Sequence, residues 1–337
     1  MNTPRTVSVI IPNYNGGRTL ELCLRSVLTQ HHRPAEVIVV DDCSTDDSVA
    51  IAERAGARVV RTPRNSGCGV ARNLGATHAS GAVLFFVDSD VALEPDAISS
   101  ALSVLGSEPT IGAVCGIEHP VPLLNNSLVA RFRALQYHYW SASSEGNVSF
   151  LFPNICAIRA DVFAELGPFS AALRQTEEVD YGYRLSRRYR LRLTSAVRGR
   201  HDHDARLVTL LRKLFQRGRL RVPLYAKARR FAKGFETANR AYASVAALLA
   251  VVSTVLPLAA GALAAAVPVL LFAVSVGLDA GMYRFVLREQ GPAFLGYFTV
   301  MQFLVNVTIA ASVAVGAAQW IASRRFRVLY DTPAVTS

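Results

Sequence analysis

The sequence lacks the marks of several protein classes. Met1–Thr6 runs directly into an apolar segment without a basic-then-apolar lead, which predicts that no signal peptide opens the chain. The cysteines form no CxxC pair and show no spacing typical of metal ligands, and an odd, scattered set of this kind indicates reduced side chains that fill space in a cytosolic domain. These cysteines are Cys23, Cys43, Cys68, Cys115 and Cys156.

Charge is missing from two long stretches in the C-terminal third, residues 241–278 and residues 291–323. One bilayer crossing takes about 20 apolar residues, so the first stretch is long enough for two crossings. Pro257 and Gly261 lie near its middle, which predicts a membrane hairpin over 241–278. The second stretch predicts one overhanging span, two short spans or a partly interfacial helix. A pair of buried helices in a soluble domain is the alternative for the hairpin.

Acidic residues are almost absent from residues 206–240, where Glu236 stands against eleven Lys or Arg residues. That segment carries a net charge of +10 out of the formal +11 of the chain. Basic residues directly before a first span mark the cytoplasmic side and attract anionic lipid. Because the cluster adjoins the apolar hairpin and forms no module of its own, we expect a membrane partner and no nucleic acid.

These patterns predict a multi-pass protein of the inner (plasma) membrane. We expect a cytoplasmic domain over residues 1–205, a basic juxtamembrane helical segment over 206–240 and a membrane region over 241–323. Arg324, Arg325 and Arg327 open a tail, residues 324–337, that we expect on the cytoplasmic side as well.

Short apolar runs alternate with amphipathic segments in the first hundred residues. Thr19 can cap a helix whose apolar face repeats at helical spacing, and further helices are expected near Asp46–Ala55 and after Asn65. Strands that alternate with helices of this length predict an α/β fold with a mostly parallel, Rossmann-like sheet flanked by helices. The expected strands are Val7–Ile11, Glu36–Val40, Arg58–Arg61 and Val83–Val87.

Polar clusters follow three of these strands: Pro12–Asn15, Asp41–Asp42 and Asp88–Asp90. Ligands of parallel sheets bind beyond the carboxyl ends of the strands, so we expect these clusters to converge on one nucleotide site. Asp88 and Asp90 are two residues apart in extended backbone and point the same way. Two close carboxylates suit a divalent cation, Mg²⁺ or Mn²⁺, although Asp residues after a strand are also common in ordinary turns.

Three further residues are candidates for donor binding. An aspartate at the end of the second strand, such as Asp42, can accept the N3–H of a uracil or thymine ring. Asn65 and Arg72 lie on the loop and helix that follow the third strand. Arg72 can offer its planar fork to a phosphate, or it can serve as a surface or ion-pair arginine.

The chain resembles the family 2 glycosyltransferases of the GT-A fold. The resemblance spans about Thr6–Arg219 and rests on the segments VSVIIPNYNGGRTLELCLRSVLTQ, EVIVVDDCSTDDS, NSGCGVARNLGATHASGAVLFFVDSD and LFPNICAIRADVFAELGPF, which occur in the order of that family. It implies a nucleotide-sugar donor, with Tyr14 and Asp42 near the base. It also implies that Asp88 and Asp90 are the carboxylates of the metal and ribose-diphosphate site. A UDP-sugar is the donor we favour.

The resemblance assigns roles in the second half of the domain as well. The family has an acidic pair before a helix, whose second member is the general base. Here that pair is Glu177 and Glu178, so Glu178 replaces an aspartate; Glu178 is the first candidate for the base and Glu177 the second. Similar members place a histidine near residue 200 that completes the metal shell, with His201 as the first candidate and His203 as the second.

A last absence bears on the product. Processive synthases of this family carry a Gln-x-x-Arg-Trp motif, and neither Trp140 nor Trp320 lies in one. We therefore expect a metal-dependent inverting transfer of a single sugar to an acceptor hydroxyl at the inner membrane face. The acceptor would be lipid-linked or a nascent envelope glycan. The alternatives are transfer to a polyprenyl phosphate, which needs no general base, and a catalytically inactive scaffold that keeps the fold.

Overall fold

The computed structural model describes residues 6–228, Gly234 and residues 237–331. These residues fall into two compact units. The first unit holds residues 6–203 together with Gly234 and Asp331, and the second holds residues 204–228 and 237–330. Arg229, Arg230 and Lys233 of the predicted basic segment and residues 332–337 of the predicted tail lie outside the described residues.

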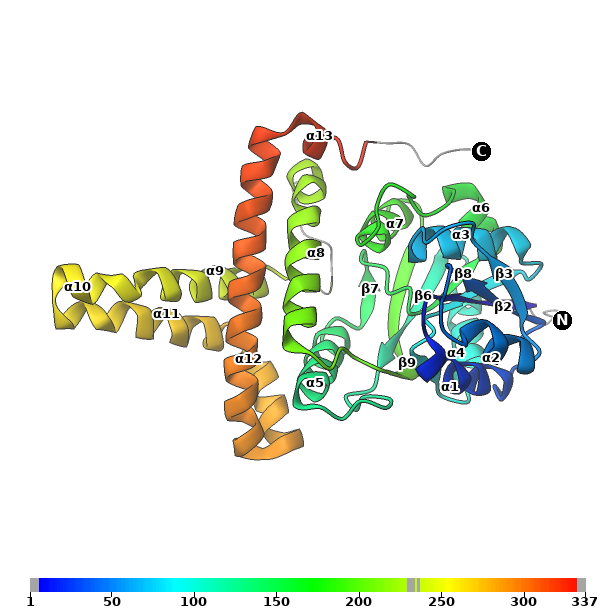
Figure 1. Ribbon diagram of the computed structural model, residues 1–337, viewed down its shortest axis with the longest axis horizontal. Helices are drawn as coiled ribbons and strands as arrows, with labels where there is room; N and C mark the ends of the chain where they lie inside the picture. Colours follow the sequence, from blue (N-terminus) through cyan, green and yellow to red (C-terminus); the bar gives the residue numbers. More distant parts are fainter. Residues whose placement is uncertain (1–5, 229–233, 235–236, 332–337) are drawn as a thin grey trace. The chain divides into compact units, whose positions relative to one another are not determined.

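The first unit is built on one sheet with helices on both faces (Figure 1). The strand order is β3-β2-β1-β4-β8-β6-β9-β5, and β7 pairs with β9. The pairs β1–β2, β1–β4, β2–β3 and β6–β9 are parallel, whereas β8 runs antiparallel to β4 and β6. The strands are β1 (Val7–Asn13), β2 (Glu36–Asp41), β3 (Arg58–Arg61), β4 (Val83–Val87), β5 (Val91–Leu93), β6 (Ile111–Glu118), β7 (Gly146–Val148), β8 (Ile155–Arg159) and β9 (Arg190–His201).

The helices of this unit pack their apolar faces onto the sheet. In α1 the residues Leu20, Cys23, Leu24 and Val27 are buried at helical spacing, as the sequence predicts. Leu28, which was expected on the same face, is the last residue of the helix and is 40% exposed, and the helix begins at Gly17, before Thr19. All five residues of β4 are buried, which is typical of a central strand covered on both faces. The helices are α1 (Gly17–Leu28), α2 (Ser48–Arg54), α3 (Cys68–His78), α4 (Ala97–Ser107), α5 (Leu128–Ala142), α6 (Ala160–Leu166) and α7 (Glu177–Leu185).

The predicted α/β fold with a mostly parallel sheet is confirmed, and the four predicted strands are present. Two of them extend further than predicted, β1 to Asn13 and β2 to Asp41, because the two strands stay paired to that point. The carboxyl ends of β1, β2 and β4 therefore lie at one edge of the sheet, with the polar clusters directly beyond them.

The second unit is helical. Its members are α8 (Leu207–Ala228), α9 (Ala238–Val252), η1 (Ser253–Val255), α10 (Leu256–Ala260), η2 (Ala262–Ala265), α11 (Ala266–Gly277), α12 (Ala280–Ala322) and α13 (Arg324–Arg327). Gly261 turns the chain with φ 84° between α10 and η2, so residues 238–277 form a hairpin of paired helices. By length and composition two helical stretches are able to cross a membrane, Ala238–Ala260 and Ala280–Ala322. Gly291, with φ 78°, kinks α12 near its start.

Candidate active site

The loops that follow β1 and β2 are tied together at the edge of the sheet. The amide of Asp42 donates to the carbonyl of Asn13 at 2.8 Å, which continues the pairing of the two strands. Asn15 and Cys43 adopt left-handed backbone conformations, with φ 52° and 65°, which is uncommon for residues other than glycine. The hydroxyl of Ser44 accepts hydrogen bonds from the backbone and side chain of this first loop.

The predicted base-binding residues flank these loops. Pro12 is buried, whereas Tyr14 is 53% exposed and stands free for a stacking partner. Asp41 is buried, and its carboxylate oxygens lie 3.3 and 3.4 Å from the amide nitrogen of Ser44. Pro12 and Tyr14 at the carboxyl end of β1 therefore differ, because Pro12 is buried within the strand and Tyr14 faces solvent.

Asp42 organises the loop that leads into α3. Its carboxylate accepts hydrogen bonds from the Thr62 hydroxyl at 2.6 Å and from the amides of Ser66 and Gly67, each at 2.8 Å. Asn65 in the same loop donates to the carbonyl of Asp42 at 3.4 Å. The predicted residues Asp42 and Asn65 thus come together, and the carboxylate shapes the loop wall on its side of the site.

Arg72 links the end of β4 to the start of α7. Its Nη2 lies 2.7 Å from Asp88 Oδ1, and its Nη1 lies 3.3 Å from Glu177 Oε1. The arginine is 2% exposed, and although burial opposes its charge, the two carboxylates and Cys68 raise its pKa. The ion-pair role that the sequence left open for Arg72 is therefore the arrangement in this structure, and its fork is occupied by Asp88 and Glu177.

The acidic pair of residues 177 and 178 opens α7. Both side chains are buried and lie in the first turn of the helix, where the helix dipole favours negative charge. Glu177 faces Arg72, so its carboxylate is held in an ion pair. The two candidates for the general base therefore have different surroundings: Glu177 belongs to the ion pair with Arg72, and Glu178 does not belong to that pair.

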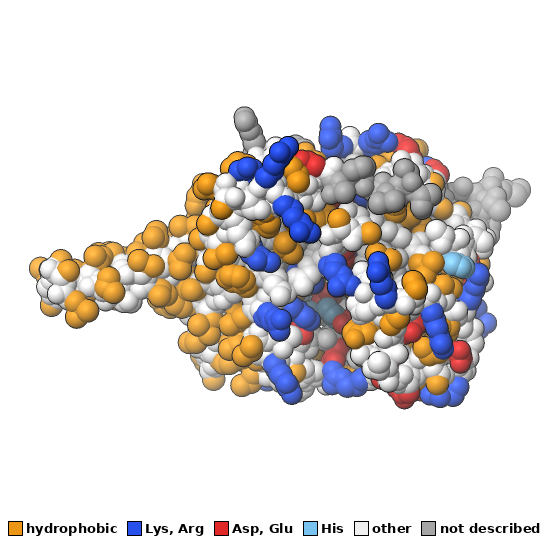
Figure 2. Space-filling view, turned by 45° about the horizontal axis from the view of Figure 1, so that its top comes forward, with side chains coloured by type: hydrophobic (Ala, Val, Ile, Leu, Met, Phe, Trp, Pro, Cys, Tyr) orange, Lys and Arg blue, Asp and Glu red, His pale blue; other side chains and the backbone are white. Residues whose placement is uncertain are grey.

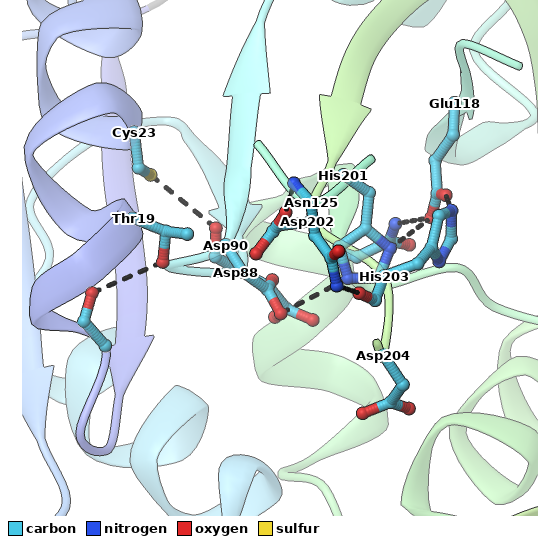
Figure 3. A network of polar contacts seen from close by, with 12 residues as sticks. Thr19, Cys23, Asp88, Asp90, Glu118, Asn125, His201, Asp202, His203 and Asp204 are labelled. Carbon is cyan, nitrogen blue, oxygen red and sulfur yellow. Dashed lines mark hydrogen bonds and ion pairs between the residues drawn. The ribbon is translucent and has the colours of Figure 1, made fainter. Parts of the chain in front are cut away.

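Asp90 contacts the histidine that the sequence placed in the metal shell. Asp90 Oδ2 lies 3.2 Å from His201 Nε2, which joins the loop after β4 to the end of β9 (Figure 3). On its other side His201 Nδ1 lies 3.1 Å from Glu118 Oε1. Glu118 Oε2 lies 3.0 Å from His203 Nε2, so one buried glutamate contacts both histidines.

The charged forms of the residues in this chain of contacts, from Asp90 through His201 to Glu118, stabilise one another. Burial disfavours the charged form of Glu118, but His201 and His203 lower its pKa well below the usual range of a glutamate. Burial likewise opposes protonation of His201, yet Glu118 and Asp90 raise the pKa of its imidazole well above the ordinary value. Burial and the neighbouring His201 lower the pKa of His203. His201 thus lies between two carboxylates, whereas His203 contacts Glu118 alone among these acidic residues.

The donors around Asp90 fit a divalent cation. Asp90 Oδ1 is a buried oxygen that has no hydrogen-bond partner among the described residues, and Oδ2 faces an imidazole nitrogen. Carboxylate oxygen and imidazole nitrogen together suit Mn²⁺ and related ions. A metal-ligating histidine usually donates its other N–H to a carboxylate, and Glu118 occupies that place for His201. Asp88, the other predicted ligand, has one oxygen engaged by Arg72.

Glu118 is a site residue that our reading of the sequence missed. It follows the apolar run Ile111–Ile117 at the end of β6, so the same signal that marks Asp88 was present there. His201, His203 and Glu118 also form a cluster whose candidate ligand atoms lie within 4.8 Å of one another. A carboxylate at the end of a buried strand is thus informative even without a second acidic residue beside it.

The sheet order and the carboxylates at the end of β4 define the class of protein. A mostly parallel sheet with an Asp-x-Asp pair beyond a central strand is the arrangement of GT-A glycosyltransferase domains. Residues 8–167 match the model of the glycosyl transferase family 2, and this domain belongs to that family.

Relatives and solved structures agree with this assignment. The chain is 28% identical over 184 residues to an uncharacterised glycosyltransferase of Haemophilus influenzae, over 52% of this chain and 60% of the relative. It is 40% identical over 104 residues to the putative teichuronic acid biosynthesis glycosyltransferase TuaG of Bacillus subtilis, over 29% of this chain and 41% of the relative. The matches thus span 60% or less of these relatives' length.

One solved structure shares the fold over most of the chain. It is the mannosyltransferase PcManGT from Pyrobaculum calidifontis in complex with GDP-Man and Mn²⁺. The likeness covers 93% of this chain and 88% of that protein, with a TM-score of 0.59 and 19% sequence identity. The GT-A fold predicted from the sequence is confirmed by this likeness.

Proposed function

We propose that the protein is a metal-dependent inverting glycosyltransferase that moves one sugar from a nucleotide-sugar donor to an acceptor hydroxyl. The observation that carries this proposal is the contact of Asp90, in the turn after β4, with His201 at the end of β9, since both are candidate metal ligands. The donor of PcManGT, GDP-Man, supports a nucleotide sugar here as well. Uracil N3–H and guanine N1–H are both donors, so an acidic base pocket suits UDP- and GDP-sugars alike.

In this mechanism Asp90 and His201 would hold the divalent cation, and Glu118, which contacts His201 Nδ1, would fix the orientation of the ring. The bound cation supplies charge stabilisation for the departing diphosphate. Glu178 takes the proton from the acceptor hydroxyl, which attacks the face of the anomeric carbon opposite the leaving group. Glu177 pairs with Arg72 and keeps the start of α7 in place.

Donor hydrolysis tests the proposed reaction class directly. The purified protein, incubated with a panel of UDP-, GDP- and dTDP-sugars, should release a nucleoside diphosphate from one donor group. We expect the release to require Mn²⁺ or Mg²⁺ and to stop when EDTA is added. If no donor in the panel were hydrolysed with either metal, the scaffold alternative would replace the enzyme proposal.

The identity of the acceptor can be tested at Glu178. A hydroxyl acceptor needs a general base, so Glu178→Gln should lower the transfer rate by about 10²- to 10⁴-fold while donor binding stays within a factor of a few. An acceptor phosphate is already an anion, so a nearly unchanged rate would favour transfer to a polyprenyl phosphate instead. Glu108→Gln, a change of the same chemistry at an exposed ion pair, is the matched control.

We further propose that the reaction belongs to cell-envelope glycan or glycolipid synthesis at the inner face of the plasma membrane. The name of TuaG, a putative teichuronic acid biosynthesis glycosyltransferase, supports an envelope glycan. The apolar hairpin and the basic residues of α8 support a site close to anionic lipid, and hence a lipid-linked or nascent glycan acceptor. The absence of a Gln-x-x-Arg-Trp motif supports the addition of a single sugar.

A further inference from the structure

The helices of the second unit form two pairs that run crosswise. α9 and α11 pack together as the arms of the hairpin, and α8 packs against α12. Figure 1 shows the yellow hairpin leaving sideways from near the middle of the orange-to-red α12, and α8 running beside that helix. The two pairs therefore cannot both lie along the normal of one membrane.

A buried polar cluster fixes the root of the hairpin on α12. Asn306 accepts a hydrogen bond from Gln302 at 3.0 Å and donates to Ser275 of α11 at 3.3 Å. The hydroxyl of Ser244 on α9 lies 3.5 Å from the same Asn306 oxygen. Residues 302–306 lie near the middle of the charge-free stretch 291–323, so the hairpin is attached at that level of α12.

An ion pair closes the root. Arg240 in the first turn of α9 and Asp279 after α11 approach to 3.6 Å, and both side chains are mostly buried. Between these two residues the chain carries no charge at all. The boundary between charged and apolar surface thus runs through the root of the hairpin, beside α12.

α8 lies directly against the second half of α12. A Cβ atom at Gly218 would meet Ser312 Oγ at 2.1 Å, and one at Gly316 would meet the Arg219 carbonyl oxygen at 2.8 Å. Gly316 also lies against Val222, whose Cγ2 a Cβ atom at Gly316 would meet at 2.7 Å. Ser312 and Gly316 thus follow one another along α12 in the same order as Gly218 and Val222 along α8, so the two helices run in the same direction. α8 carries six basic residues and no acid: Arg212, Lys213, Arg217, Arg219, Arg221 and Lys227.

These contacts decide which pair can enter the hydrocarbon. If α12 crossed the bilayer, the basic residues of α8 and the ion pair of Arg240 with Asp279 would be carried to hydrocarbon depth, which is costly for charged groups. If the hairpin enters, α8 and α12 stay among the headgroups, where cations of α8 meet anionic phosphates.

The hairpin has the surface that such an insertion needs. Leu258 is 90% exposed and Leu263 is 93% exposed on either side of the turn at Gly261. Figure 2 shows this projection covered with hydrophobic side chains, with no Lys, Arg, Asp or Glu visible on it. From Ala241 to the turn the chain has about 20 residues, roughly 30 Å of helix and close to the thickness of the hydrocarbon core.

We propose that the hairpin of α9–α11 is the membrane-inserted element, and that α8 and α12 lie along the membrane surface against anionic headgroups. Residues 291–323 then form an interfacial helix, and not a further span. Both ends of α12 lie on one side of the membrane. This arrangement stands independently of the proposed activity, because it rests on the second unit alone.

Depth measurements on the full-length protein test the proposal. Single cysteines are placed at the exposed residues Ala293, Leu304 and Ile321 of α12 and at Leu258 of the hairpin, in a Cys43→Ser, Cys68→Ser background. Each is labelled with bimane in vesicles of phosphatidylcholine and phosphatidylglycerol that contain nitroxide lipids. We expect lipid labelled near the headgroup to quench all three α12 positions most, and lipid labelled deep in the chain to quench Leu258→Cys most.

Two results would overturn the proposal. One is a profile in which Leu304→Cys lies deeper than both Ala293→Cys and Ile321→Cys, since that is the profile of a spanning helix. The other is a lack of quenching at Leu258→Cys by either lipid. The circular dichroism spectrum of each labelled variant shows whether the protein is still folded, and it is a readout separate from both depth and activity.

Sidedness gives an independent measurement. Cysteines at Glu289 and Arg324, which flank the charge-free stretch, are probed with a membrane-impermeant maleimide in intact spheroplasts and in inverted vesicles. We expect both to react from the same side in the same preparation. Reaction from opposite sides would mean that residues 291–323 cross the bilayer.

Discussion

Replacing Asp90 by alanine is expected to lower donor turnover on the order of 10³-fold and to abolish Mn²⁺ binding at the site. The carboxylate contributes the oxygen Oδ1, which has no hydrogen-bond partner among the described residues, and the oxygen Oδ2 that faces His201 at 3.2 Å. Preorganised charge at a developing anion is typically worth 10²- to 10³-fold for a single group, so about the upper end of that range is expected for a residue that holds the cation. Steady-state hydrolysis and Mn²⁺ titration followed by electron paramagnetic resonance measure the two effects.

Two variants make this result specific. Asp96→Ala removes an exposed aspartate that makes no side-chain cap to its helix, and it should leave both measurements unchanged. Glu118→Gln removes the charge behind His201 and should weaken Mn²⁺ binding by about 10- to 100-fold, less than the loss at Asp90. Parent-like Mn²⁺ affinity in Asp90→Ala would place the cation elsewhere and refute the assignment of the ligands.

The part of the site at the ends of β1, β2 and β4 could be predicted because each strand there is short, apolar and followed at once by polar residues. Val83–Val87 is the strongest case, since five buried residues end directly at Asp88. Parallel neighbours bring such ends together by geometry, so the register of Asn13 with Asp41 follows from the order of the elements.

The second half of the sheet could not be predicted in the same way. β8 inserts antiparallel between β4 and β6, and β9 returns parallel beside β6 from the far end of the domain. The contact of His201 with Asp90 depends on the placement of β9 beside β6, and no local sequence pattern predicts that placement. The family resemblance supplied the histidine, whereas Glu118 and the ion-pair role of Arg72 required the structure.

The membrane region shows a similar limit. Length and composition identify apolar helices, but they do not state which helix has a charged neighbour. The close approach of Gly218 to Ser312 places the basic residues of α8 beside α12, and this contact, made 94 residues along the chain, changes the meaning of the stretch 291–323. A hydropathy profile does not show which helices pack against each other.

The other large effect is expected at Arg72, where replacement by alanine should destabilise the first unit by about 3–5 kcal/mol. Arg72 is 2% exposed and contacts Asp88 and Glu177, so its removal leaves two carboxylates, one of them buried, without their shared cation. The loss should appear as a fall of roughly 10 °C or more in the thermal midpoint, followed by circular dichroism.

The matched change is Arg190→Ala, which removes an arginine from an ion pair with Glu108 in which both side chains are about half exposed. That variant should stay within about 1 kcal/mol of the parent, because exposed pairs are screened by water. The double variant Arg72→Met, Glu177→Gln should be more stable than the single variant Arg72→Met. It removes a carboxylate together with its cation, so less uncompensated charge stays buried. If Arg72→Ala and Arg190→Ala had the same thermal midpoint, the stability of the first unit would not depend on the pairing of Arg72 with Asp88 and Glu177. Other contacts would then have to connect the end of β4 to the start of α7.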